Sequence, residues 1–300
     1  MELRNITGNT YIIEAKAYIG LYVMAGGKCV LMDTGYRHEQ PELEELLERE
    51  HLEPAALLCT HTHHDHFGNA RYLHDRYGAQ IILTLGEAAM CQSPAQWSSY
   101  VGFCSVGAFE RSHNSRNVGQ ADVLITRVQD SVDICGERFG VVHTPGHSAD
   151  HASFITPDGV CFAGDCLLSD TVMENSKMPF LYTCGEALAS QRRLPECGAE
   201  TFIISHRTVI GREEAKKLSE KNQAWFGQCL DDLLSCVRET LSLDELSLKM
   251  CARRKMQSGK PDKARAIRRI IESMAGYLID EGELEAIAEA GIVKYRRTKA

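Results

Sequence analysis

Short apolar runs alternate with longer segments of helical spacing along residues 1–211. The apolar runs predict β-strands at 11–14, 18–24, 28–32, 55–59, 80–83, 130–134, 139–143, 152–155, 160–163 and 201–205. Between them, apolar positions three and four residues apart predict helices over 39–51, 67–77 and 185–197. Because strands and helices alternate, the pattern indicates an α/β architecture.

Two segments depart from this alternation. Residues 91–122 are rich in Gly, Ser, Asn and aromatic residues, which predicts an insertion placed to cover a substrate as a loop. After residue 211 the pattern is helical, with one long helix from Leu218 to Leu241, a helix over 242–250 and a helix with an apolar stripe over 267–278. A short hairpin around Gly291 follows, and this order resembles a winged-helix module.

The length of 300 residues fits a large domain with a smaller appendage. We therefore expect a catalytic domain over 1–211 and a helical C-terminal domain of the winged-helix type over 212–300. No apolar run is long enough for a membrane span, and the opening residues lack the layout of a signal peptide. The twelve cysteines contain no CxxC pair, which favours free thiols in a reducing compartment. We expect a cytoplasmic protein.

Charge is distributed unevenly along the chain. The net charge is −8, but residues 251–300 hold twelve Lys/Arg against seven Asp/Glu, a net of +5. Eight of these twelve basic residues form a cluster in the sequence with Asp262 as the one acidic neighbour: Arg253, Arg254, Lys255, Lys260, Lys263, Arg265, Arg268 and Arg269. Such a cluster is typical of a phosphate-binding surface, for RNA or for coenzyme A, or of a solvated helix face.

The strand at 55–59 runs into the segment His61-x-His63-x-Asp65-His66. In an extended loop, residues two apart point the same way, so His61 and His63 can converge on one ion. Asp65 and His66 then turn toward a neighbouring site. Imidazole and carboxylate ligands at this density are suited to zinc or iron.

Further candidate ligands stand at the ends of other predicted strands. His147 lies in the turn Thr144-Pro145-Gly146-His147-Ser148, Asp165 follows the strand at 160–163, and His206 follows the strand at 201–205. Because a sheet edge can gather residues that are distant in sequence, these side chains are expected to join the His61–His66 cluster.

With these residues in place, five ordered segments resemble the motifs of the metallo-β-lactamase superfamily: 31–35, 60–68, 144–148, 164–165 and 205–207. The resemblance covers about residues 10–211 and implies an αββα sandwich. It implies that His61, His63 and His147 hold a first metal, that Asp65, His66 and His206 hold a second, and that Asp165 bridges both. Asp33 would orient a ligand loop or simply cap its strand.

The same motifs narrow the resemblance within the superfamily. His63 stands where diiron flavoproteins carry glutamate, and Asp165 stands where some lactamases carry cysteine. Leu168 occupies the place of a tyrosine typical of acyl-homoserine lactonases, which weakens that option. The set is similar to glyoxalase-II-like and β-lactamase-like-protein-2-like hydrolases.

The resemblance implies a hydrolase that uses a metal-bridged hydroxide to cleave an ester, thioester or lactone, with Asp65 relaying the proton. Two divalent transition metal ions are the expected cofactors, zinc first, with iron or manganese as alternatives. The expected partner is a small-molecule substrate, and the basic segment could bind this substrate if the substrate is anionic. No membrane partner is expected. The oligomeric state is open, with a dimer as one option. An RNA-processing nuclease, a mononuclear-iron oxygenase of the persulfide-dioxygenase kind and a non-catalytic sensor are the alternatives. The acidic body disfavours the nuclease, and the complete ligand set disfavours the sensor.

Overall fold

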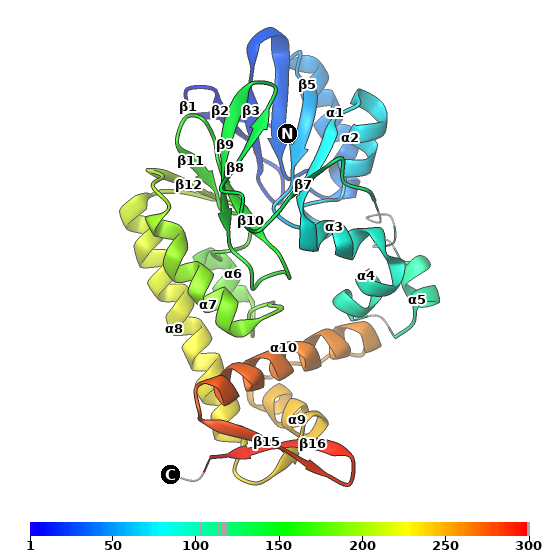
Figure 1. Ribbon diagram of the computed structural model, residues 1–300, viewed down its shortest axis with the longest axis vertical. Coiled ribbons are helices and arrows are strands. Elements are labelled where there is room, and N and C mark those ends of the chain that lie inside the picture. Colours follow the sequence, from blue (N-terminus) through cyan, green and yellow to red (C-terminus); the bar gives the residue numbers. More distant parts are fainter. Residues whose placement is uncertain (103, 113–114, 116–118, 299–300) are drawn as a thin grey trace.

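The computed structural model describes residues 1–102, 104–112, 115 and 119–298. Two β-sheets pack face to face and carry helices on their outer sides, and a smaller helical part lies at one end (Figure 1). The first sheet has seven strands in sequence order: β1 (Leu3–Thr7), β2 (Thr10–Ile13), β3 (Ile19–Val23), β4 (Lys28–Met32), β5 (Glu53–Leu58), β6 (Gln80–Thr84) and β7 (Val123–Ile125).

The second sheet has six strands in the order β13-β12-β11-β10-β9-β8. Their bounds are β8 (Ser131–Ile134), β9 (Glu137–His143), β10 (Ala152–Ile155), β11 (Val160–Phe162), β12 (Thr201–Ile204) and β13 (Thr208–Gly211). The connecting helices are α1 (Gln40–Arg49), α2 (Ala70–Tyr77), α6 (Asp170–Asn175) and α7 (Cys184–Arg193), with short 3₁₀ turns η1 (Ala25–Gly27), η2 (Arg37–Glu39) and η4 (Leu194–Glu196). This arrangement confirms the predicted αββα sandwich.

Side chains of the central strands alternate between two cores. Val30 and Met32 of β4 face the core between the sheets, whereas Cys29 and Leu31 face the core under α1 and α2. Strands buried on both faces consist of nearly continuous apolar residues. This is why the sequence pattern located β4, β5 and β6 to within about two residues, whereas the partly exposed strands β1, β7 and β13 gave no such signal.

The carboxyl ends of these strands meet at one edge of the sandwich. Strands β4, β5 and β6 are parallel neighbours, as are β11 and β12, so the residues that follow them emerge on the same side. The segment after β4 begins with Asp33, that after β5 leads to His61, and that after β12 leads to His206. The predicted gathering of strand-end residues is therefore a direct result of the topology.

Residues 94–101 and 106–110 of the insertion are helical, so the expectation of a loop is wrong for these residues. Its helices are α3 (Leu85–Gln92), α4 (Pro94–Val101) and α5 (Val106–Glu110). Ser93 caps α4 by accepting a hydrogen bond from the Gln96 N–H at 3.3 Å, and Trp97, Tyr100 and Phe109 form a small apolar core. Residues 103, 113–114 and 116–118 of the expected 91–122 insertion lie outside the described residues.

The C-terminal part contains three helices and a three-stranded sheet of order β14-β16-β15. In chain order the elements are α8 (Arg212–Cys236), β14 (Leu241–Ser242), α9 (Leu243–Arg253), α10 (Pro261–Asp280), β15 (Leu284–Glu289) and β16 (Ile292–Arg297). The expected helix, helix and hairpin order is present. The long helix ends at Cys236, however, so its predicted extension to Leu241 is wrong: Leu241 pairs with Tyr295 in the small sheet.

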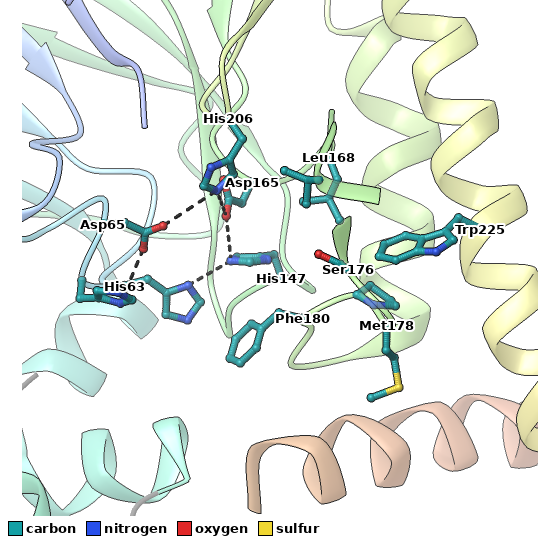
Figure 2. Close-up of a pocket in the computed structure, with 13 residues that line it drawn as sticks. His63, Asp65, His147, Asp165, Leu168, Ser176, Met178, Phe180, His206 and Trp225 are labelled. Carbon is teal, nitrogen blue, oxygen red and sulfur yellow. Dashed lines mark hydrogen bonds and ion pairs between the residues drawn. The ribbon is translucent and has the colours of Figure 1, made fainter. Parts of the chain in front are cut away.

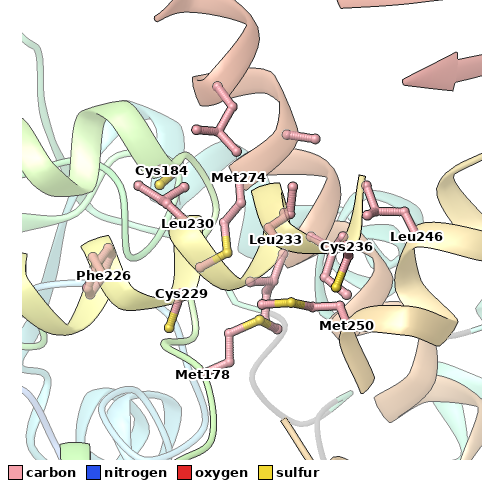
Figure 3. Packing of buried hydrophobic residues seen from close by; sticks show 14 of the residues in the cluster. Met178, Cys184, Phe226, Cys229, Leu230, Leu233, Cys236, Leu246, Met250 and Met274 are labelled. Atoms are coloured by element: carbon pink, nitrogen blue, oxygen red, sulfur yellow. The ribbon is translucent and has the colours of Figure 1, made fainter. Parts of the chain in front are cut away.

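One apolar cluster joins this part to the sandwich. Phe226, Leu233, Met250 and Met274 pack together with Cys184 of α7 (Figure 3). Residues on both sides of position 211 thus share a core. Within the described ranges, none of the helices combines the length and the hydrophobicity that a membrane crossing requires.

Candidate metal centre

The loop after β5 and the turns after β9, β11 and β12 bring histidines and aspartates to the floor of one pocket (Figure 2). Ring nitrogens of His61, His63 and His147 lie within 4.8 Å of one another. His63 Nδ1 and His147 Nε2 are 3.0 Å apart, and the His61 ring lies 4.4 Å from the His63 ring. Three imidazoles that converge in this way form a candidate first metal site.

A second group lies beside the first. Asp65, His66 and His206 also offer ligand atoms within 4.8 Å of one another. Asp165 stands between the groups: its Oδ2 lies 3.4 Å from His147 Nε2 and 3.3 Å from His206 Nε2, and its Oδ1 lies 3.4 Å from His66 Nε2. The structure thus brings together all seven residues that the sequence singled out, with Asp165 lying between the two groups.

Asp33 lies behind this second group. Its Oδ2 is 2.7 Å from His66 Nδ1, and its Oδ1 accepts a hydrogen bond of 2.7 Å from the Thr60 N–H. Asp33, His61 and His66 also offer ligand atoms within 4.8 Å of one another. The Asp33 carboxylate is already used by these donors, however, so it orients His66 and leaves His66 Nε2 free to face Asp165.

The electrostatics divide the histidines into two classes. Burial lowers the pKa of His61, His63 and His147, so these imidazoles are neutral, which is the form that binds a metal. Burial alone would lower the pKa of His66 as well, but the carboxylates of Asp165, Asp65 and Asp33 raise it above its usual value. The second group therefore carries the negative charge that attracts a cation.

Buried polar atoms test whether a metal fits here. His61 Nε2, His66 Nε2 and Asp165 Oδ1 are buried without a hydrogen-bond partner among the described residues. Native proteins rarely leave such atoms unpaired, and each of these is a good ligand for a divalent transition metal. The donor set and its unpaired atoms therefore fit two metal ions.

Glu87 of α3 is a buried carboxylate that sequence reasoning missed. It accepts hydrogen bonds from the N–H and O–H of Thr62, at 3.0 and 2.8 Å, and from the hydroxyl of Ser148 at 2.6 Å. Thr62 lies between His61 and His63, and Ser148 follows His147. The Glu87 carboxylate thus holds the loop that carries His61 and His63 and the loop that carries His147. A signal was present, because Glu87 follows β6 much as Asp33 follows β4.

His151 holds the backbone of the bridging residue. Its Nε2 accepts the Asp165 N–H at 3.1 Å, and its Nδ1 lies 2.8 Å from the Thr144 hydroxyl. Both ring nitrogens of His151 are thus occupied by contacts within the protein, which gives His151 a structural role. Gly164 is required beside it: φ is +57°, and a Cβ there would lie 2.5 Å from His151 Nε2.

Three further residues lie close to the metal groups: His64, Cys166 and Leu168. The His64 side chain is 60% exposed and lies at the pocket, where its Nδ1 is 3.8 Å from Asp65 Oδ1, but it belongs to neither group of converging ligand atoms. Cys166 is buried, and burial raises its pKa to about 12, which suits a packing role rather than a nucleophile. Leu168, which replaces the lactonase tyrosine, lines the pocket.

The basic cluster expected in residues 253–269 is broken up by acidic partners. Arg253 and Arg254 form ion pairs with Asp232 of α8. Arg268 forms an ion pair of 2.7 Å with Asp244 of α9. Asp262 is the one acidic residue within this stretch of the sequence, but in three dimensions α8 and α9 supply further carboxylates to the cluster.

Comparisons with known proteins agree with this geometry. A family model described as the metallo-beta-lactamase superfamily matches residues 8–206. A hydroxyacylglutathione hydrolase of Chromohalobacter salexigens is 31% identical over 147 residues, 48% of this chain and 45% of that protein. The uncharacterized protein ML0493 of Mycobacterium leprae is 30% identical over 164 residues, 54% of this chain and 72% of that protein. The chain thus matches less than half the length of the hydroxyacylglutathione hydrolase.

Two solved structures share the fold over nearly the whole chain. The metallo-beta-lactamase family protein TTHA1429 from Thermus thermophilus has a TM-score of 0.72 at 23% identity, covering 97% of this chain and 99% of that one. A beta-lactamase domain protein from Burkholderia ambifaria has a TM-score of 0.70 at 20% identity, covering 99% and 94%. Because the family model matches well over half of the sequence, the chain belongs to the metallo-β-lactamase superfamily.

Proposed function

We propose that the protein is a hydrolase with two metal ions that cleaves an ester, thioester or lactone. The observation that carries this proposal is the pair of His/Asp groups that share Asp165 on the floor of a pocket of about 370 Å³. The similarity to a hydroxyacylglutathione hydrolase, which is a hydrolase by name, supports the same reaction class.

In the proposed site His61, His63 and His147 hold the first ion, Asp65, His66 and His206 hold the second, and Asp165 touches both. Two divalent ions, zinc first and iron or manganese as alternatives, would supply an activated water and polarise the scissile carbonyl. Asp65 turns Oδ2 toward His66 at 3.6 Å and His206 at 3.9 Å. Its other oxygen, Oδ1, is the atom that would accept and relay the proton.

The pocket walls indicate the kind of substrate. Beyond the histidines the lining is largely apolar and includes Leu168, Met178, Phe180 and Trp225 (Figure 2). Such walls suit the apolar part of an acyl compound. The substrate proposed here is therefore a small molecule with an apolar segment next to its scissile bond.

The lysines that line an adjoining cavity favour a substrate that carries an anionic group. This cavity has a volume of about 470 Å³ and shares Ser176, Met178 and Phe180 with the pocket over the metal groups. Three lysines line it, and its described lining contains no carboxylate: Lys177, Lys255 and Lys263. A carboxylate or phosphate extending from the scissile bond would meet these ammonium groups.

Metal analysis together with substrate assays tests the proposal. Protein loaded with zinc should contain about two equivalents per chain, and removal of the metal should abolish hydrolysis of thioester, ester and lactone substrates. Asp165→Ala should lose metal and activity while keeping its far-UV circular dichroism, whereas the matched control Asp130→Ala, at an exposed position that is not part of either group, should keep both. A single equivalent of iron with oxygen-dependent turnover would instead favour the oxygenase.

A nuclease has weaker support than the hydrolase. In a winged-helix nuclease the basic face of α10 would have to be open to phosphates. Here Arg268 is paired with Asp244, and the Arg269 guanidinium lies over the rings of Tyr100, Phe180 and Tyr182. If metal-loaded protein cleaved RNA but no thioester, ester or lactone, the nuclease would be favoured over the hydrolase.

A further inference from the structure

Tyr100 of the insertion contacts a residue of the first metal group directly. Its hydroxyl lies 2.8 Å from His63 Nε2, and its ring stacks on the His63 ring with 5.5 Å between centroids and 15° between planes. Tyr100 is 3% exposed, so this contact is shielded from water. The opposite nitrogen of His63, Nδ1, faces His147.

The direction of the hydrogen bond between Tyr100 and His63 follows from the nitrogen that His63 turns toward the first metal group. That nitrogen is Nδ1, which lies 3.0 Å from His147 Nε2. A neutral imidazole that offers Nδ1 to a metal carries its proton on Nε2, so Nε2–H donates to the Tyr100 hydroxyl 2.8 Å away. His63 then presents the lone pair of Nδ1 to the first metal group.

The Tyr100 ring is held from its other side by the C-terminal part of the chain. The Arg269 guanidinium of α10 lies 4.9 Å from the Tyr100 ring, 5.4 Å from the Tyr182 ring and 5.6 Å from the Phe180 ring. In the part of the chain that the structure describes, Nε, Nη1 and Nη2 of Arg269 are buried and have no hydrogen-bond partner. The aromatic faces therefore provide the attraction that keeps this cation in place.

Backbone packing brings these two helices close together. Gly102 ends α4, and a Cβ at that position would lie 2.9 Å from the Asp262 carbonyl oxygen and 3.0 Å from the Ala266 nitrogen of α10. The glycine thus permits α10 to approach α4 closely enough for Arg269 to reach Tyr100. Figure 1 shows the N-terminal end of α10 lying next to α4.

We propose that Tyr100 is a positioning residue that fixes the metal-binding tautomer of His63, and that Arg269 braces Tyr100 from α10. This proposal rests on the metal-dependent function proposed above. It assigns to the insertion and to the C-terminal part a role in the geometry of the first metal group. Neither residue belongs to the ligand motifs.

Stepwise zinc titration of metal-free protein tests the role of Tyr100. Wild-type protein should bind two equivalents. Tyr100→Phe keeps the ring but removes the acceptor of His63 Nε2–H, so one of the two binding steps should weaken about tenfold to a hundredfold, as for other residues that orient a metal ligand. The other step should be unchanged, and the metal-free variant should keep the cooperative melting of the wild type. A Tyr182→Phe control removes a hydroxyl from another ring over Arg269 and should leave both steps unchanged.

A double-mutant cycle tests the role of Arg269. Arg269→Met should weaken the same binding step by a smaller factor and should add less in a Tyr100→Phe background than in the wild type, because both changes act through His63. Fully additive losses would overturn the bracing role of Arg269, and unchanged zinc binding in Tyr100→Phe would overturn the whole inference. Failure of wild-type protein to bind zinc, iron or manganese would instead contradict the proposed function.

Discussion

At the scale of single residues, two buried carboxylates stand behind the metal groups from opposite sides. Asp33 accepts from Thr60 and His66, next to the second group, and Glu87 accepts from Thr62 and Ser148, next to the first. Each carboxylate fastens loops that carry several histidines. The precision of the site therefore depends on acceptors that do not themselves face the pocket.

Replacing Glu87 should show this dependence. Glu87→Gln keeps the size of the side chain but turns one oxygen into a donor that faces other donors, so the free energy of unfolding of metal-free protein should fall by roughly 3 kcal/mol. Glu110→Gln, at an exposed position on α5, should change it by less than about 0.5 kcal/mol. Urea unfolding followed by circular dichroism measures both. Equal stabilities of the two variants would contradict the role given to Glu87.

The residues found from sequence and those missed differ in a physical way. His61, His63, Asp65 and His66 are dense in one loop, and Asp165 follows an apolar strand, so local pattern is enough to select them. Tyr100 was visible only as an aromatic residue of the insertion. Its contacts with His63 and Arg269 arise from packing between segments about 37 and 169 positions away in the chain, which no local pattern encodes.

At the scale of elements, the buried strands were predicted well and the insertion was not. Its Gly- and Ser-rich composition suggested a loop, although Ser93 followed by Pro94 is a helix-start signal and Gly102 is a helix-stop signal. Composition over a long window concealed these local signals. The helices matter because α4 carries Tyr100, which contacts His63, and because its end at Gly102 packs against α10.

The contact between α4 and α10 can be tested at one glycine. Gly102 and Gly136 both have a φ of +88°, but a Cβ at Gly102 would lie 2.9 Å from the Asp262 carbonyl oxygen, whereas Gly136 has nothing within 4 Å. Both alanine variants should lose about 1 kcal/mol from backbone strain. Gly102→Ala should lose roughly 1–3 kcal/mol more from overpacking, measured as the difference between the two variants in urea. The same loss in both variants would mean that α4 and α10 are not tightly packed.

At the scale of the whole molecule, the apolar cluster around α8 joins the two parts of the chain. Leu168, Met178 and Cys184 come from the sandwich side of residue 211, and they pack with Leu233 and Met274 from the other side. A division into domains at 211 and 212 would cut through this core. Sequence pattern located the change from strands to helices at that point, but it could not reveal which apolar faces bury one another.

Unfolding experiments can show whether the two parts melt together. The chain has two tryptophans: Trp97 lies in the insertion beside His63, and Trp225 lies on α8. Trp97→Phe leaves Trp225 as the reporter, and Trp225→Phe leaves Trp97. Because the core is shared, tryptophan fluorescence and far-UV circular dichroism should give coincident midpoints within each metal-free variant, as expected for one cooperative transition. Comparing two probes within one variant removes any effect of the substitution on stability. Separate midpoints in either variant would mean that residues 1–211 and 212–300 fold as independent units, and the bracing of Tyr100 by Arg269 would then depend on a docking equilibrium between them.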